Sequence, residues 1–168
     1  MPFQLRPEAD TWFKSISSEL PFKTKFDLYY LCLMLGLASG RNDGVSGAPD
    51  MVDYFVADYA PVARLITALL VIAEANRLGI QFTEKAAVKR LLDDYLDPTH
   101  PAYITKDGFQ KLNDYANGGF LILNEALPDR PRYAASFFQF YKALLDDHVS
   151  KSDHWSTYVG GPEVRQAQ

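Results

Sequence analysis

The fold class is decided by the stretch FKTKFDLYYLCLMLG, residues 22–36. Thr24 and Asp27 stand three residues apart and resemble a capping box, which marks the start of a helix. After Asp27 the segment has no polar face, so we expect a helix from Thr24 to about Ala38 that is buried on most sides. The core residues expected on this helix are Leu31, Cys32 and Leu35.

The rest of the chain also shows helical periodicity, and no alternation of period two persists beyond a few residues. The segment 61–78 is apolar nearly all round, which indicates a second buried helix. Asn117-Gly118-Gly119 should interrupt a later helix or mark a close helix crossing, because glycine is costly inside a helix. Other helices are expected at about 7–20, 49–58, 83–97, 105–116, 120–127 and 132–149.

These segments predict an all-α protein, a single globular bundle of about seven helices with two buried central helices. A chain of 168 residues is long enough for one domain with a real core and too short for two of ordinary size. We expect residues 1–150 to form the single helical domain and residues 151–168 a polar C-terminal tail. Trp155 and Tyr158 are the apolar anchors of that tail and candidate partner-binding residues.

The composition limits the class of protein. The apolar fraction of 48% and aromatic fraction of 14% exclude disorder as the default. The formal net charge is −4, whereas a domain whose whole surface binds nucleic acid is usually basic. The longest apolar run, residues 28–38, is shorter than the roughly 20 residues of a membrane span, and the N-terminus lacks the order of a signal peptide. We therefore expect a soluble cytoplasmic protein without membrane contact.

Residues that carry chemistry do not assemble into a catalytic or metal-binding motif. The single cysteine, Cys32, lies in the most apolar segment and is interpreted as a small buried hydrophobe. No set of nucleophile, base and orienting residue is apparent, so an enzymatic role is not indicated, and we predict no cofactor and no metal. Two polar clusters are interpreted as solvated helix ends: Asp93, Asp94 and Asp97, and Asp147, His148, Asp153 and His154.

Basic residues mark both ends of the helix that begins at Thr24. Lys23 and Lys25 flank Thr24, where unpaired backbone N–H groups and the helix dipole favour a phosphate group. A contact with the DNA backbone is one interpretation, and ordinary solubilising lysines are the other. Arg41 follows the far end of the helix and would reach the same edge only in an oligomer. The candidate nucleic-acid-binding residues are Lys23, Lys25 and Arg41.

The first forty residues resemble a known family. The opening FQLRPEA, residues 3–9, and the later apolar helix containing Leu31-Cys32-Leu33 resemble the start of the small helical E subunit of bacterial DNA phosphorothioation (Dnd) systems. The run FKTKFD, residues 22–27, is similar to a segment of small proteins associated with such systems. The resemblance implies a non-enzymatic accessory subunit of a DNA-modification or phage-defence system that docks other protein subunits, forms oligomers and contacts the DNA backbone. The alternative is a protein–protein adaptor or homo-oligomeric structural protein without nucleic-acid binding.

Overall fold

The computed structural model describes residues 1–44, 46–127 and 129–151, and this part of the chain is helical without any strand. Two isolated bridges, Gln4 with Asp50 and Leu96 with Ile104, are its extended pairings. The prediction of an all-α fold is confirmed, with six α-helices in the described residues against the seven or so expected. The helices are α1 Pro7–Trp12, α2 Lys25–Ser39, α3 Ala63–Leu78, α4 Lys85–Tyr95, α5 Lys106–Ala126 and α6 Ala134–Lys151, and a 3-10 turn, η1 Ala60–Val62, precedes α3.

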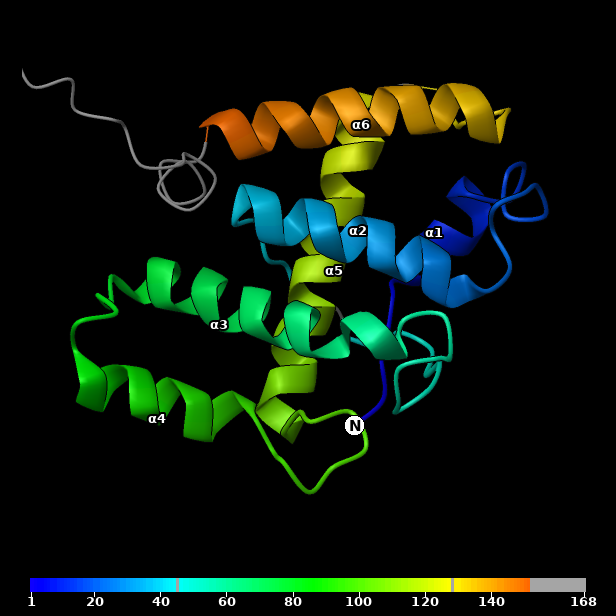
Figure 1. Ribbon diagram of the computed structural model, residues 1–168. Helices are drawn as coiled ribbons and strands as arrows, with labels where there is room; N and C mark the ends of the chain where they lie inside the picture. Colours follow the sequence, from blue (N-terminus) through cyan, green and yellow to red (C-terminus); the bar gives the residue numbers. More distant parts are fainter. Residues whose placement is uncertain (45, 128, 152–168) are drawn as a thin grey trace, which may run out of the picture.

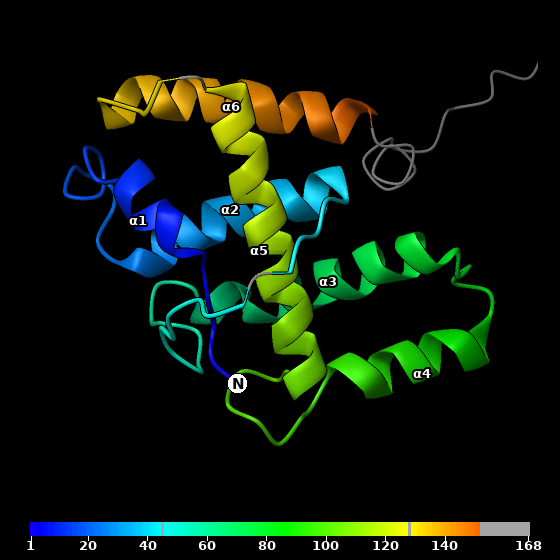
Figure 2. The ribbon, with the colours of Figure 1, turned by 180° about the vertical axis from the view of Figure 1, so that it is seen from behind.

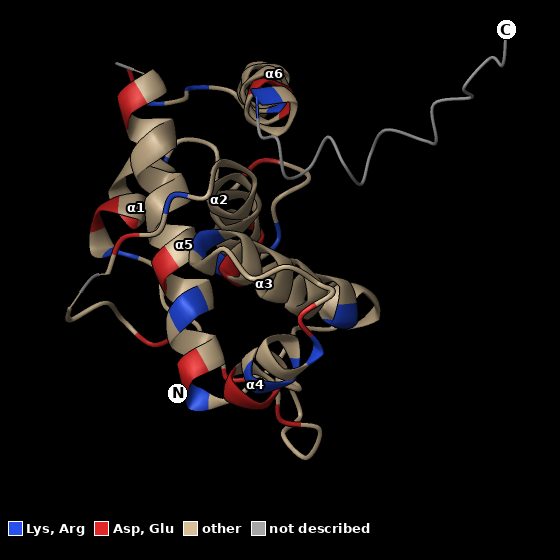
Figure 3. Ribbon diagram, turned by 90° about the vertical axis from the view of Figure 1, so that its left-hand side faces the viewer, with Lys and Arg blue, Asp and Glu red and all other residues tan. Residues whose placement is uncertain are grey.

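The helices are stacked across one long helix. In Figures 1 and 2, α6, α2 and α3 lie one above another, and α5 crosses all three. Figure 3 shows the first group nearly end-on, with α5 running along one side and α4 beneath α3. The buried apolar side chains form one cluster between these layers. No helix among the described residues combines the length and the apolarity needed to cross a bilayer.

Glycines set the distance between α2 and α5, which form the most extensive helix contact. A Cβ atom on Gly119 would lie 1.8 Å from the carbonyl oxygen of Cys32, and one on Gly36 would lie 1.9 Å from that of Tyr115. A Cβ atom on Gly118 would lie 2.2 Å from the carbonyl oxygen of Arg41. The two backbones therefore touch, which confirms the predicted close crossing. The expected interruption is wrong, because α5 runs unbroken through these glycines.

The start and the core of α2 follow the sequence closely. Thr24 is the N-cap and forms the predicted capping box with Asp27. Cys32 and Leu35 are fully buried as predicted, whereas Leu31 is only half-buried and packs against the outside of the core, so its predicted place inside the core is wrong. The backbone oxygen of Leu31 accepts a hydrogen bond from the Tyr141 hydroxyl on α6, at 2.9 Å. The prediction of a helix buried on most sides is confirmed.

The second central helix is α5, and the expectation that 61–78 would take this place is wrong. Helix α3 buries one face against α2 and α5 and leaves another open, with Leu65 57% exposed. Helix α4 covers only part of the remaining face of α3. Apolar side chains on the uncovered part stay exposed, which is common on protein surfaces. Helix α5 is instead buried through its middle, including the polar residues Asn113 and Asn117.

Two predicted helices are shorter or absent. Helix α1 ends at Trp12, and residues 13–20 continue as turns with Phe13 and Ile16 buried. Three serines in this stretch are poor helix formers, which explains the early end. Residues 49–58 form no helix, because this segment pairs with the extended N-terminus.

The extended N-terminal segment is hydrogen-bonded on both of its sides, to residues 51–52 and to α5. The Phe3 N–H donates to the oxygen of Val52 at 2.7 Å, and the Met51 N–H donates to the oxygen of Phe3 at 3.0 Å. On the other side, Asn113 and Asn117 of α5 accept hydrogen bonds from the backbone N–H groups of Gln4 and Arg6, both at 2.9 Å. These long-range bonds outweigh the local helical preference of 49–58.

Candidate functional site

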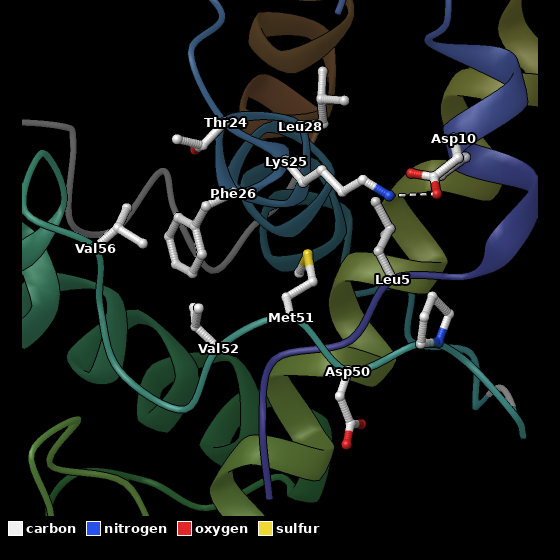
Figure 4. A pocket seen from close by; sticks show the side chains of 12 residues that line it. Leu5, Asp10, Thr24, Lys25, Phe26, Leu28, Asp50, Met51, Val52 and Val56 are labelled. Atoms are coloured by element: carbon white, nitrogen blue, oxygen red, sulfur yellow. Dashed lines mark hydrogen bonds and ion pairs between the residues drawn. The ribbon is translucent and has the colours of Figure 1, made fainter.

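A mostly apolar groove lies beside the first turn of α2, and Figure 4 shows it from close by. Its volume is about 440 Å³, which is within the range of ligand sites. Three elements build it: the extended N-terminus with α1, the start of α2, and the segment 49–56. We call it the α2 groove. It is lined by Leu5, Ala9, Asp10, Thr24, Lys25, Phe26, Leu28, Pro49, Asp50, Met51, Val52 and Val56.

The two walls of the groove differ in burial: the firm wall, formed by α2, is part of the core, and the wall formed by residues 51–56 is partly exposed. Phe26 is buried and packs edge-on against Phe3, so the α2 side is part of the core. Met51, Val52 and Val56 are only half-buried, and they belong to the non-helical segment. Apolar side chains left in contact with water at a concave surface are the usual sign of a binding site.

The carboxylate of Asp27 already binds backbone N–H groups at the N-terminus of α2. One oxygen of the Asp27 carboxylate accepts the backbone N–H groups of Lys23 and Thr24, both at 2.7 Å. The other accepts the Tyr59 hydroxyl at 2.6 Å. Partial burial alone would raise the pKa of Asp27, but these hydrogen bonds outweigh it and the pKa lies below its ordinary value. The donors that would bind a phosphate here are therefore partly used.

The two lysines predicted at this helix end lie close together, and each is in an ion pair. Lys23 Nζ is 2.8 Å from Asp58, and Lys25 Nζ is 2.6 Å from Asp10. The hydrogen bond with Asp58 raises the pKa of Lys23. Both pairs are largely exposed, so each contributes little to stability and can open to another partner.

A second, more polar hollow adjoins the α2 groove and shares four of its residues. We call it the lysine hollow. Its lining brings a third lysine, Lys14, to the two that were predicted. It is lined by Asp10, Lys14, Ser17, Lys23, Thr24, Lys25 and Leu28.

The third candidate, Arg41, is not part of this group. It follows the C-terminal end of α2, which lies about 22 Å from the N-terminal end for a helix of this length. Its guanidinium group makes two hydrogen bonds, at 2.7 and 2.8 Å, with the carboxylate of Glu125 on α5. This pairing raises the pKa of Arg41 and lowers that of Glu125. Trp155 and Tyr158, the predicted partner-binding residues, lie outside the described residues.

A buried carboxylate was missed by the sequence analysis. Glu74 on α3 is fully buried, and its two oxygens accept the hydroxyls of Tyr115 at 2.8 Å and Tyr95 at 2.9 Å. Arg77, one turn later, donates two further hydrogen bonds. A single Glu in an apolar helix, with Arg three residues on, was the available signal. The group binds α3, α4 and α5 together and has its hydrogen bonds satisfied within the protein, so we assign it a structural role.

The electrostatics of this cluster favour an ionised Glu74. Burial by itself would raise the pKa of Glu74, but the hydrogen bonds from Arg77, Tyr115 and Tyr95 bring it below its ordinary value. Burial and the adjacent carboxylate raise the pKa of Tyr95 to about 12, and that of Tyr115 further. The tyrosines therefore stay protonated and donate to the carboxylate at neutral pH.

The acidic cluster near the end of α4 is held by local partners. Asp93 pairs with Lys89 at 2.6 Å, and Asp97 accepts the backbone N–H and the hydroxyl of Thr99. The part of the chain that the structure describes contains no group of three or more acidic, histidine or cysteine side chains arranged to hold a metal ion. Asp153 and His154 lie outside it.

A further apolar hollow of about 510 Å³ lies between α3 and α4. The Arg64 guanidinium lies over the ring of Tyr103, 5.6 Å from its centre, at the edge of this α3–α4 hollow. This second apolar hollow serves as a control site in experiments on the α2 groove. It is lined by Arg64, Thr67, Ala68, Val71, Ile72, Phe82, Leu92, Leu96, Pro98 and Tyr103.

The chain matches no family model, no curated protein and no solved structure.

Proposed function

We propose that this protein is a non-enzymatic docking subunit that binds an apolar segment of a partner protein in the α2 groove. The observation that supports this most directly is the groove itself, where half-buried Met51, Val52 and Val56 face the firm wall formed by α2. Apolar anchors in such a pocket supply most of the binding energy of a typical interface.

The chemistry of the groove defines its occupant as an extended apolar segment that carries a basic residue. Between residues 50 and 56, only the Met51 N–H donates a backbone hydrogen bond, so the other amides of this non-helical segment are free to bind the backbone of a partner. Asp10 and Asp50 stand at the rim against Lys25 alone, which leaves a net negative charge. A basic side chain beside the apolar anchors would complement it.

The biological setting is proposed from the sequence resemblance alone. That resemblance supports an accessory subunit of a bacterial DNA-modification or phage-defence system acting in the cytoplasm, with other subunits of the system as its partners. The products of genes adjacent to this one are therefore the defined candidates for the occupant of the groove.

The test is co-purification of each neighbouring gene product with tagged protein. Met51→Glu places a charge among the groove's apolar side chains, and Leu65→Glu makes the same kind of change on the exposed face of α3. We expect one product to co-purify with the wild type and with L65E and to be lost with M51E. Retention of that product by M51E, or self-association in place of any neighbour, would contradict the proposal, the second in favour of a homo-oligomeric structural protein.

A contact with the DNA backbone is a second candidate, and the observation that favours it is the lysine hollow. Lys14, Lys23 and Lys25 line one concave surface at a helix N-terminus. The carboxylates of Asp10, Asp27 and Asp58 oppose it by occupying the same donors.

Fluorescence anisotropy with a short DNA duplex at two salt concentrations tests whether the lysine hollow contacts the DNA backbone. Each phosphate neutralised contributes about 0.9 to the slope of log affinity against log salt. K23E/K25E should abolish such binding and leave the fold intact. If the wild type does not bind DNA at low salt, the DNA contact is rejected, and the proposal that the α2 groove binds a partner protein is unaffected.

A further inference from the structure

A polar hollow of about 490 Å³ lies between α1 and the C-terminal half of α5, apart from the α2 groove in its chemistry. Two arginines line it, one from the N-terminal segment and one from the connection between α5 and α6. Aromatic and aliphatic side chains of α1 and α5 form the rest of its wall. We call it the Arg6 hollow. It is lined by Arg6, Glu8, Trp12, Phe120, Leu121, Asn124 and Arg130.

The Nε atom of the Arg6 guanidinium group lacks a hydrogen-bond acceptor. Its side chain is only 15% exposed, and its Nε atom is buried without a hydrogen-bond partner. The nearest charge is the Glu8 carboxylate, 3.7 Å from that Nε atom and beyond hydrogen-bond distance. Leaving this buried N–H donor unpaired costs free energy. An acceptor is therefore missing at this position.

A second unpaired donor belongs to the same place. The Asn117 side chain is 1% exposed, and its Nδ2 atom has no hydrogen-bond partner. Its oxygen accepts the backbone N–H of Arg6, so the two residues are in direct contact. Asn117 is not one of the lining residues, but it lies one turn before Leu121, which is one of them. Two adjacent residues thus carry buried donors without acceptors.

The charge and the walls of the hollow define the missing ligand. Arg6 and Arg130 face the single carboxylate of Glu8, so the lining carries one net positive charge. Arg130 is exposed and has no ion-pair partner among the described residues. One net charge suits a monoanion, and the flat guanidinium fork matches a carboxylate. Trp12, Phe120 and Leu121 offer apolar contact to the body of such a molecule.

We propose that the Arg6 hollow binds a small carboxylate with an apolar body. Arg6 and Arg130 hold the carboxylate, and the aromatic wall contacts the hydrocarbon part. Glu8 competes for the same guanidinium group when the site is empty, and it turns outward when the ligand enters. Its side chain is 69% exposed, which leaves it free to do so.

Isothermal titration calorimetry of the full chain with acetate, pentanoate and inorganic phosphate tests this. We expect pentanoate to bind more tightly than acetate, because only pentanoate reaches the apolar wall. Arg130→Gln should weaken pentanoate binding at least about tenfold. Glu8→Gln should strengthen it by removing the competing carboxylate. Arg132→Gln is the matched control, since Arg132 is an exposed arginine outside the hollow.

Arg6→Gln should abolish pentanoate binding. Arg130 and Glu8 are exposed, so their variants should fold and test the site even if R6Q does not fold. Tighter binding of phosphate than of pentanoate would overturn the carboxylate assignment. No binding of either carboxylate, or binding that R130Q leaves at the strength of R132Q, would overturn the site itself.

Discussion

At the scale of single residues, burial decides which chemistry is available. Glu74 and Cys32 are both fully buried, yet they differ in consequence. The Glu74 carboxylate has four hydrogen bonds within the protein and stays charged. The Cys32 thiol has no charged partner, and burial raises its pKa well above the ordinary value. The first group holds three helices together, and the second only fills space.

Replacing Glu74 by glutamine should change how stability depends on pH. The folded pKa of Glu74 lies below its ordinary value of 4.5, so its contribution is complete above that pH and is lost as the pH falls through the folded pKa. We expect E74Q to be less stable than the wild type by about 2–4 kcal/mol at pH 7. Urea unfolding at pH 7, 4 and 3 should show this difference shrinking with acid. A difference that stays constant would contradict an ionised Glu74.

Cys32 should be inert in the native protein. The thiolate is the reactive form, and burial both raises the thiol pKa and excludes the reagent. We expect a thiol-specific reagent to modify the protein only in denaturant. Rapid modification of the native protein at neutral pH would mean that α2 opens or that Cys32 is exposed.

At the scale of elements, what the sequence could predict was local. The start of α2 follows from Thr24 and Asp27, three residues apart, and its burial from the apolar run after them. The central place of α5 did not follow, because its buried asparagines hold an N-terminal segment more than a hundred residues away. The ion pairs of Lys23 and Lys25 also join distant segments, so their partners could not be read from spacing.

The crossing of α2 and α5 should tolerate no side chain at Gly119. A Cβ atom there would lie 1.8 Å from the backbone oxygen of Cys32, and a backbone cannot move aside as a flexible side chain can. Gly119→Ala should therefore destabilise the protein by at least about 3 kcal/mol, although alanine favours helices. Asn124→Ala on the exposed part of α5 is the control and should have a small effect. A raised melting temperature for G119A would refute the contact.

At the scale of the whole molecule, the helices form the frame, and the non-helical segment 49–56 lies at its edge. Figure 3 shows basic and acidic residues interleaved along the ribbon, which fits the ion pairs of Lys23, Lys25 and Arg41 and the net charge of −4. Such a surface favours recognition by shape and apolar contact over steering by one large charged face. The α2 groove beside the segment 49–56 and the α3–α4 hollow are two places where the described structure offers that contact.

Amide hydrogen exchange, measured with and without the co-purified partner, tests the docking proposal most directly. Residues 50 and 52–56 donate no backbone hydrogen bonds in the free protein, so their amides should exchange fast. We predict that the partner slows amide exchange at residues 50 and 52–56, while exchange around the α3–α4 hollow is unchanged. Slower exchange at residues 64–103 around that hollow, with residues 50 and 52–56 still exchanging fast, would contradict the account.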